Sequence, residues 1–423
     1  MTQNSAASKS PARLRDEGSY DWGLITIVAA LLALGIVMVF SASYAQGLLM
    51  LSTPDPFYFV LRQIGWVAVG LVAMIVAMRL PYHFWQRWSV PLMGVALVAL
   101  LLVMLFGNER FGSQRHFLGG SIQPSEPAKL LIIAYVAAWL ASKGARIRSV
   151  QVGLVPFAVL MGIVSVLLVA QPDISTAILM VSTASIMFFI AGAELRQLLA
   201  VGLLGGATFW LVIQNSAHAG SRVARYWGAI WNPLESDEWQ TQRTLSALVN
   251  GGLFGQGLGG GEYKLPGSMP VAWSDNIFAV IGEELGLFGA LLVVFLFAML
   301  IFRGLRTALR APDAFGMLLA VGITTLLALQ TLLNIAVVVA IAPPTGVTLP
   351  FVSYGGSSMV TVLGAVGILL SIGRGSRTAP SGADSQNFYA RFNLGWGNGR
   401  SRLPRASRRA ASTPAGRRPA NRA

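Results

Sequence analysis

The sequence predicts an all-α polytopic membrane protein with about ten transmembrane helices, both termini in the cytoplasm and one large loop on the outer face. Three observations lead to this prediction. Hydrophobic residues make up 54% of the 423 positions and charged residues only 11%, whereas a soluble domain carries roughly 25% charged residues. Apolar runs long enough to cross a bilayer recur along the chain. Lysine and arginine are distributed between the loops as the positive-inside rule requires.

Each predicted span is a run of about 20 largely apolar residues. The runs lie near residues 22–44, 57–78, 88–107, 128–142, 150–170, 174–193, 197–214, 276–302, 314–341 and 357–373. The fourth run is short, and only residues 171–173 separate the fifth from the sixth. Removing a middle span would place the later basic loops on the outer side, so ten spans with both termini inside is the self-consistent number.

The organisation follows from these spans. Residues 1–21 form a polar cytoplasmic tail, residues 22–373 a transmembrane domain with an outer loop at about 215–275, and residues 374–423 a basic tail predicted to be disordered. The polar start does not resemble a cleaved signal peptide. The net charge of +14 is concentrated in the last tail, which anionic lipid headgroups would attract, so no nucleic-acid partner is expected. The absence of cysteine excludes disulfides and thiolate metal sites.

The first polar constellation lies between Gly112 and Lys129, ahead of the fourth span. Ser125 or Glu126 is expected to cap that helix, with Pro127 in its first turn. Lys129 then stands where the helix dipole disfavours a cation, and Glu126 is close enough along the helix to offset it. Two interpretations follow: Lys129 and Arg115 bind a phosphate, or Lys129 pairs with Glu126 and extends toward the lipid headgroups.

The second constellation is the Gln-Pro-Asp-Ile-Ser-Thr segment at 171–176. Proline breaks the helix here, and Asp173 can cap the helix that follows. Capping alone would explain the aspartate. A broken helix at membrane depth is nevertheless tolerated only where it lines protein or water, so a functional role for Asp173 stays open.

The third constellation begins with Asp275 at the outer start of a long apolar helix. Asp275 is either an N-cap or a reactive carboxylate. Below it, a stripe of small residues is expected to admit a neighbouring helix or a lipid chain; it comprises Ala279, Gly282, Gly286 and Gly289. Glu283 and Glu284 lie about two turns deeper, where ionisable residues are expensive and usually functional, although structural hydrogen bonding is the alternative.

The fourth constellation, residues 343–358, is rich in proline and glycine and precedes the last span. Exposed backbone N–H groups at that helix start, together with Ser357 and Ser358, could bind an anion. The glycine-rich run at 251–261 is not a nucleotide loop, because no Gly-Lys-Ser/Thr follows it. It is expected to be flexible hinge material in the outer loop.

Taken together, these segments resemble the SEDS family (shape, elongation, division and sporulation proteins). The resemblance spans roughly residues 20–375, and the matching stretches come in the family's order. They are Arg115 with Gln123–Lys129, Gln171–Ala177, Asp275–Glu284 and Thr348–Ser358. Thr348-Leu-Pro350 is more similar to the division-type members than to the elongation-type members, and sporulation-type members remain open. His116, Ser175 and Asn276 depart from the usual residues, which leaves the charged positions intact.

The resemblance implies a peptidoglycan glycosyltransferase that polymerises lipid II at the outer face of the bacterial inner membrane, at the division septum. Asp275 would be the general base on the attacking sugar hydroxyl. The residues implied to bind substrate or pyrophosphate are Arg115, Lys129, Glu126, Asp173, Ser357 and Ser358, with Glu283 and Glu284 in support. A divalent cation, Mg or Mn, could assist. The implied partners are lipid II, the lipid-linked glycan, a class B penicillin-binding transpeptidase and other membrane proteins of cell division.

Two other functions compete with this one. A lipid II flippase would need ionisable groups near the membrane midplane and internal inverted repeats. No clear repeat is visible, and only Glu283 and Glu284 approach that depth. A non-catalytic scaffold that recruits a transpeptidase would leave Asp275 and Lys129 without a role.

Overall fold

The structure is a computed structural model that describes residues 20–49, 54–106, 108–110, 113–116, 123–215 and 239–378, with the single positions Gly220, Tyr226 and Gly228. Within these residues, eight helices are long and apolar enough to cross a membrane, and two shorter apolar helices accompany them. The ten are α1 (Trp22–Leu49), α2 (Tyr58–Arg79), α4 (Ser89–Phe106), α5 (Ser125–Lys143), α6 (Val155–Ala170), α7 (Ile174–Ile190), α8 (Leu195–Asn215), α11 (Ile277–Leu309), α12 (Ala314–Val338) and α13 (Gly356–Thr378). The prediction of about ten helices is confirmed.

Smaller elements occupy the connections. A short helix α3 (His83–Arg87) follows α2, and a hairpin of β1 (Asn108–Arg110) and antiparallel β2 (Ser113–His116) lies between α4 and α5. A 3-10 turn (Gly144–Arg148) and a π turn (Val150–Leu154) connect α5 to α6, and α10 (Trp239–Gly251) lies in the predicted outer loop. The sequence analysis predicts none of these elements. Of the predicted tails, 1–21 and 374–423, residues 1–19 and 379–423 lie outside the described residues, whereas residues 374–378 belong to α13.

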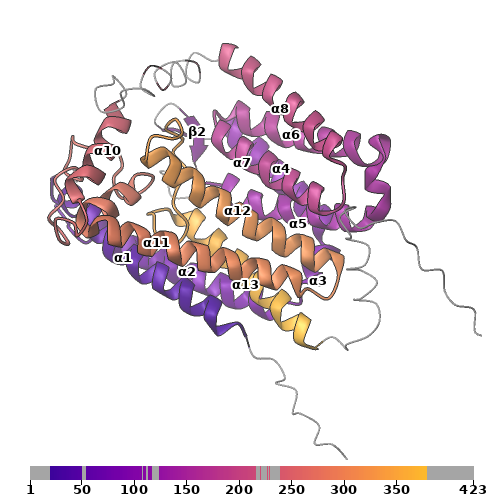
Figure 1. The fold of residues 1–423 in the computed structure, drawn as a ribbon, viewed down its shortest axis with the longest axis horizontal. Helices are drawn as coiled ribbons and strands as arrows, with labels where there is room; N and C mark the ends of the chain where they lie inside the picture. The colour runs from indigo at the N-terminus through magenta and orange to yellow at the C-terminus, as the bar shows by residue number, and fades with distance from the viewer. Residues whose placement is uncertain are drawn as a thin grey trace, which may run out of the picture. The chain divides into compact units, whose positions relative to one another are not determined.

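Helix α12 is central to the packing (Figure 1). It contacts α11, α10 and α13 on one side and α5 and α7 on the other, while α2 packs along α13 and α1 packs against α11 and α2. Its side chains are buried over most of its length. Polar residues on α12 therefore face protein rather than lipid, and they connect the two groups of helices.

The start of α1 and the end of α13 lie at the same end of the helical domain. Arg303 of α11 donates to Asp21 at 3.0 Å, and Arg374 of α13 reaches the Tyr20 hydroxyl at 3.3 Å. An even number of spans, such as the ten predicted, requires both ends of the transmembrane domain to lie on the same side of the membrane. At the same end, the Tyr82 hydroxyl donates to Asp313 at 2.7 Å. Burial, with help from that carboxylate, raises the pKa of Tyr82, so the phenol keeps its proton.

Helix α11 is not continuous. Gly286 has φ 68° and ψ −166°, which breaks the helix between Glu284 and Leu287. The outer loop replaces the missing backbone hydrogen bonds. Gln256 and Gly257 N–H groups donate to the carbonyls of Glu283 and Glu284 at 2.9 and 3.0 Å, and Leu287 donates to Gly252 at 2.9 Å. The outer loop and the first part of α11 are thus one hydrogen-bonded unit.

The glycines of this region have packing roles that the sequence analysis did not predict. A Cβ on Gly255 would lie 2.1 Å from the Glu284 carbonyl oxygen, and one on Gly251 would lie 2.0 Å from that of Gly282. The run at 251–261 is therefore packed against α11, and its prediction as hinge material is wrong. Of the predicted small-residue stripe, Gly282 faces Leu248 of α10 and Gly286 faces the loop, whereas Gly289 faces Leu285 of its own helix.

Candidate functional site

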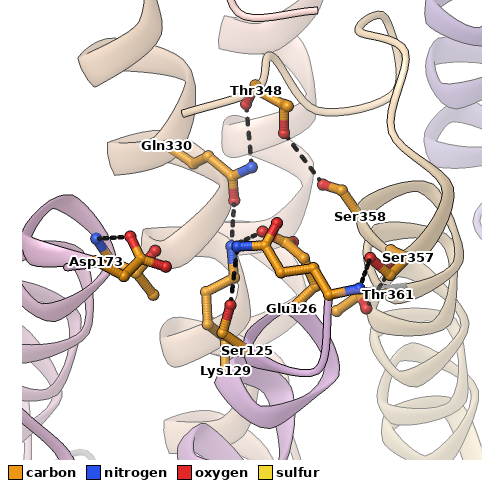
Figure 2. Close-up of polar contacts among 11 residues, drawn as sticks. Ser125, Glu126, Lys129, Asp173, Gln330, Thr348, Ser357, Ser358 and Thr361 are labelled. Carbon is orange, nitrogen blue, oxygen red and sulfur yellow. Dashed lines mark hydrogen bonds and ion pairs between the residues drawn. The ribbon is translucent and has the colours of Figure 1, made fainter. Parts of the chain in front are cut away.

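Lys129 lies inside the protein, in the first turn of α5. Its side chain is only 3% exposed, and Nζ donates to Glu126 Oε1 at 2.9 Å. Nζ also lies 3.5 Å from Oε1 of Gln330 on α12 (Figure 2). The ion pair with Glu126 is confirmed, whereas extension of Lys129 toward the headgroups is wrong, because the side chain points to the central helix. An ammonium held this way presents positive charge within the protein.

The predicted cap of α5 is also corrected. The residue that precedes the helix is Pro124, and no side chain caps it. Ser125 Oγ instead accepts from Gln123 Nε2 at 3.0 Å, and Glu126 is used by Lys129. Both side chains therefore bond to neighbouring side chains and do not accept from the backbone N–H groups at the helix start.

A short irregular segment, residues 345–349, is held by side chains from two helices. Gln330 Nε2 on α12 donates to the Thr348 carbonyl at 3.1 Å, and Ser175 Oγ at the start of α7 donates to the Thr345 carbonyl at 3.2 Å. Ser175 is one of the departures from the family pattern, and it adds a hydrogen bond here. We call residues 345–349 the bridging segment, because it lies between the two charged parts of the site.

Asp275 also lies close to the bridging segment. Asn334 Nδ2 on α12 donates to the Asp275 carbonyl and to the Val347 carbonyl, each at 2.7 Å. The Asp275 carboxylate oxygen Oδ2 is 3.9 Å from the position that a Cβ on Gly346 would take. The Asp275 carbonyl is therefore linked through Asn334 to Val347, and Lys129 is linked through Gln330 to the adjacent residue Thr348.

Asp275 does not cap α11. The N-cap position belongs to Asn276, whose side chain makes no capping bond. Asn276 Nδ2 donates to the Pro270 carbonyl at 2.6 Å, and its Oδ1 accepts from Gln240 of α10 at 3.0 Å. Asn276 thus takes the structural task of fixing the outer loop. The N-cap interpretation of Asp275 is therefore wrong, and its role as a reactive carboxylate stays a prediction.

The start of α13 closes the site from a third direction. Ser357 Oγ accepts from the Gln123 N–H at 3.1 Å, and Ser358 Oγ lies 3.2 Å from Thr348 Oγ1 (Figure 2). The two serines predicted as an anion site therefore contact the segment ahead of α5 and the bridging segment. Their roles toward a ligand stay a prediction.

The structure describes the side chain of Asp173 but not that of Arg115. Asp173 is 2% exposed and caps α7, accepting from the Thr176 N–H at 3.4 Å, so the predicted capping is confirmed. Figure 2 shows it on α7 to one side of the Lys129 cluster. Arg115 belongs to β2, which precedes the site in the chain, and its side chain lies outside the described residues.

Glu283 and Glu284 serve the outer loop rather than the Lys129 cluster. Glu283 Oε1 accepts from Asn250 Nδ2 at 3.0 Å and from the backbone N–H of Glu262 at 2.8 Å. Glu284 pairs with Lys264 of the outer loop and accepts from Ser41 Oγ of α1 at 2.7 Å. Both glutamates are buried. The two glutamates thus join the outer loop to α11 and α1, and their supporting role in the site stays a prediction.

Two functional candidates, Gln330 and Asn334, are missing from the sequence prediction. Both are almost fully buried on α12, four positions apart and thus on one helix face. A signal existed, since amides inside an apolar spanning helix are rare and usually functional or paired. The surrounding motifs drew attention to charged residues instead.

A metal site is not formed by the side chains that the structure describes. Among them, no group of three or more His, Cys, Asp or Glu is placed to hold a metal ion. The expectation of Mg or Mn stays a prediction, and no step below depends on it.

This chain is similar in sequence to a family of known proteins. The family model described as "Cell cycle protein", for FtsW, RodA and SpoVE, matches residues 22–378. The probable peptidoglycan glycosyltransferase FtsW of Trichlorobacter lovleyi is 38% identical over 89% of this chain and 99% of the relative. Stage V sporulation protein E of Bacillus subtilis is 39% identical over 85% of this chain and 98% of the relative.

Solved structures agree with the fold. A chain from the work described as "Structural coordination of polymerization and crosslinking by a peptidoglycan synthase complex" has a TM-score of 0.69 at 27% identity, covering 85% of this chain and 99% of that one. The crystal structure of Thermus thermophilus rod shape determining protein RodA has a TM-score of 0.62 at 28% identity, covering 86% and 99%. The chain therefore belongs to the FtsW/RodA/SpoVE cell cycle protein family, the SEDS family of the sequence resemblance.

Proposed function

We propose that this protein is a peptidoglycan glycosyltransferase that polymerises lipid II into glycan strands during septal wall synthesis in cell division, with Asp275 as general base. The observation that carries the proposal is the shared anchoring of Asp275 and the Lys129–Glu126 pair on adjacent residues of the bridging segment. The activity named for the FtsW relatives agrees with it. Similar identity to a sporulation protein makes the division role the finer part of the proposal.

The chemistry needs one base and one positive group. The Asp275 carboxylate takes the proton of the lipid II sugar 4-hydroxyl, whose oxygen attacks the anomeric carbon of the lipid-linked glycan. The bond from that carbon to the lipid pyrophosphate breaks, and its electron pair leaves with the pyrophosphate. A pyrophosphate is already a stable anion, so a carboxylic acid like that of glycosidases is not required. Lys129, with Arg115, stabilises the charge that develops on it.

The orientation of the site follows from the basic residues. Arg303 and Arg374 lie at the end of the helical domain where α1 begins and where α11 and α13 end. Asp275 lies at the start of α11, the opposite end of that helix, and Lys129 lies at the start of α5, next to the start of α13. The positive-inside rule assigns the first end to the cytoplasm. The site then faces outward, where glycan strands are assembled.

The geometry gives less support to the flippase alternative. A transporter needs ionisable groups near the midplane, and the two candidates for that position, Glu283 and Glu284, are engaged by the outer loop. A measurement of glycan formation distinguishes the enzyme from a non-catalytic scaffold.

The test is polymerisation of purified lipid II by the full chain, alone and with its class B transpeptidase, in detergent or liposomes. Asp275→Asn should abolish glycan formation, because the amide cannot accept the hydroxyl proton. Asp55→Asn is the matched control, since Asp55 lies ahead of a different helix, α2, and its carboxylate accepts from the Phe57 N–H at 2.9 Å. Full turnover by Asp275→Asn would remove this residue as the base.

Lys129→Ala tests the cationic role in the same assay. It should raise the KM for lipid II and lower kcat, because the departing pyrophosphate loses its counter-charge. Lys143→Ala provides the control from the opposite end of the same helix, where the lysine lies over the Trp139 ring. Unchanged kinetics of Lys129→Ala at low lipid II concentration would exclude this role.

A further inference from the structure

The α12 amides connect the two chemically distinct parts of the site. Gln330 is 1% exposed and Asn334 is 2% exposed, and their spacing places both on one face of the helix. Since α12 packs against both α5 and α11, a side chain on this face can reach the Lys129 cluster and the backbone ahead of α11. No motif of the sequence analysis included either amide.

Asn334 fixes the backbone that carries the proposed base. An asparagine amide nitrogen has two hydrogens to donate, and Asn334 uses them on the Asp275 and Val347 carbonyls at 2.7 Å each. Asp275 lies two residues before α11 begins, where helix hydrogen bonds do not fix its carbonyl. Asn334 therefore holds the Asp275 carbonyl itself, while Ser353 and Tyr354 hold the carbonyls of the two preceding residues.

Gln330 fixes the ammonium in the same way. Its Nε2 donates to the Thr348 carbonyl at 3.1 Å, while its Oε1 faces Lys129 Nζ at 3.5 Å. An amide side chain can donate to a carbonyl through its nitrogen and accept from an ammonium through its oxygen while staying neutral. A leucine would do neither, and a glutamate could not donate.

We propose that Asn334 and Gln330 are positioning residues: they hold the Asp275 backbone and the Lys129 ammonium against the neighbouring carbonyls of Val347 and Thr348, and so set the separation of base and cation. This inference rests on the proposed polymerase activity. The two amides contact the bridging segment at adjacent residues, so a shift of one is transmitted to the other. They act through Asp275 and Lys129 and need no contact with substrate.

Steady-state kinetics of lipid II polymerisation, with the full chain and its transpeptidase, give the first test. Asn334→Leu should lower kcat about 100-fold, the effect of a displacement of roughly 1 Å at a reacting group, with KM changed less than about threefold. Gln330→Met should mainly raise KM, because it acts through Lys129. Asn334→Gln keeps both donor hydrogens and should recover part of kcat. Wild-type kcat in Asn334→Leu would overturn the proposal.

The control is Thr331→Val, on the same helix between the two amides. Thr331 is 4% exposed, and its hydroxyl has no hydrogen-bond partner among the described residues. This nearly isosteric change should leave kcat and KM at the wild-type values. A loss equal to that of Asn334→Leu would mean that α12 responds to any change in its packing, which would also overturn the proposal.

A distance measurement separates this inference from the proposed function. The chain has no cysteine, so nitroxide labels at Phe106→Cys and Leu253→Cys, both exposed at 68% and 57%, report on α4 and the outer loop. The distance distribution should be narrow in the labelled parent, broaden with Asn334→Leu and stay narrow with Thr331→Val. If the wild-type chain fails to polymerise lipid II, the proposed function fails, whereas the distance distribution still tests whether Asn334 positions the site. An unchanged distribution in Asn334→Leu would refute it.

Discussion

Replacing Lys264 by methionine should release the outer loop from the membrane domain. Lys264 is 8% exposed and Glu284 is 1% exposed. Lys264 Nζ donates to Glu284 and also to Ser41 Oγ at 2.9 Å, which joins the loop, α11 and α1. Methionine keeps much of the apolar stem but leaves the Glu284 carboxylate without its counter-ion.

The size of the effect follows from the burial of this pair. Removing one partner of a buried ion pair costs about 3–5 kcal/mol, because the other charge remains buried. If that energy is lost from loop closure, the opening equilibrium rises by about 10²-fold to a few thousand-fold, at about 1.4 kcal/mol per tenfold. The loop amides report this directly, since Gln256 and Gly257 donate to the α11 carbonyls only when the loop is closed.

Hydrogen exchange followed by mass spectrometry measures the opening. Peptides covering 252–264 should exchange about 10²-fold faster or more in Lys264→Met. The double variant Lys264→Met with Glu284→Gln should recover much of the protection, because it removes the unpaired charge. Arg196→Gln is the control, since Arg196 is 87% exposed in its pair with Glu194 and such pairs contribute little. Equal protection in Lys264→Met and wild type, or no recovery in the double variant, would refute the reasoning.

Two further predictions concern local backbone structure. Gly286→Ala should destabilise the outer loop, because φ 68° with ψ −166° is a conformation that costs a non-glycine residue about 1–3 kcal/mol, and the new Cβ would lie 2.4 Å from the Gly255 nitrogen. Faster proteolysis of residues 252–257 would show this, with Gly205→Ala, in open space on α8, as the unaffected control. Asp173→Ala should lower the stability of α7 by about 1 kcal/mol through loss of its N-cap, whereas Asp173→Asn should retain most of the wild-type stability. Thermal unfolding in detergent compares the two variants with the wild type, and equal melting temperatures for the three proteins would contradict the capping role.

The spans could be predicted because lipid imposes a simple rule on the sequence. A spanning helix needs a long apolar run, and that run is visible without any neighbour. The separation of α6 from α7 at residues 171–173 followed from Pro172 and Asp173 in the same local way. Element ends that depend on side-chain partners were harder, and the predicted cap of α5 was wrong because Glu126 pairs with Lys129 instead.

The site was predicted in its charged residues and missed in its neutral ones. Lys129, Glu126 and Asp275 stand out because ionisable groups are rare in this chain, whereas Asn334 and Gln330 are meaningful only through carbonyls more than ten residues away. The break in α11 was missed for a similar reason. Gly286 is one of several glycines in an apolar run, and its conformation is fixed by a loop that precedes it in the sequence by about thirty residues.

The interrupted helix also resolves a mismatch of length with the bilayer. Helix α11 has 33 residues, which would extend about 50 Å if continuous, well beyond a hydrocarbon thickness of about 30 Å. Residues 287–309, the part beyond Gly286 (309 − 287 + 1 = 23 residues), measure about 35 Å and fit that thickness with little tilt. The turns before Gly286 would then stand above the hydrocarbon, and the proposed base Asp275 precedes those turns, as a reaction on a lipid-linked sugar at the outer face requires.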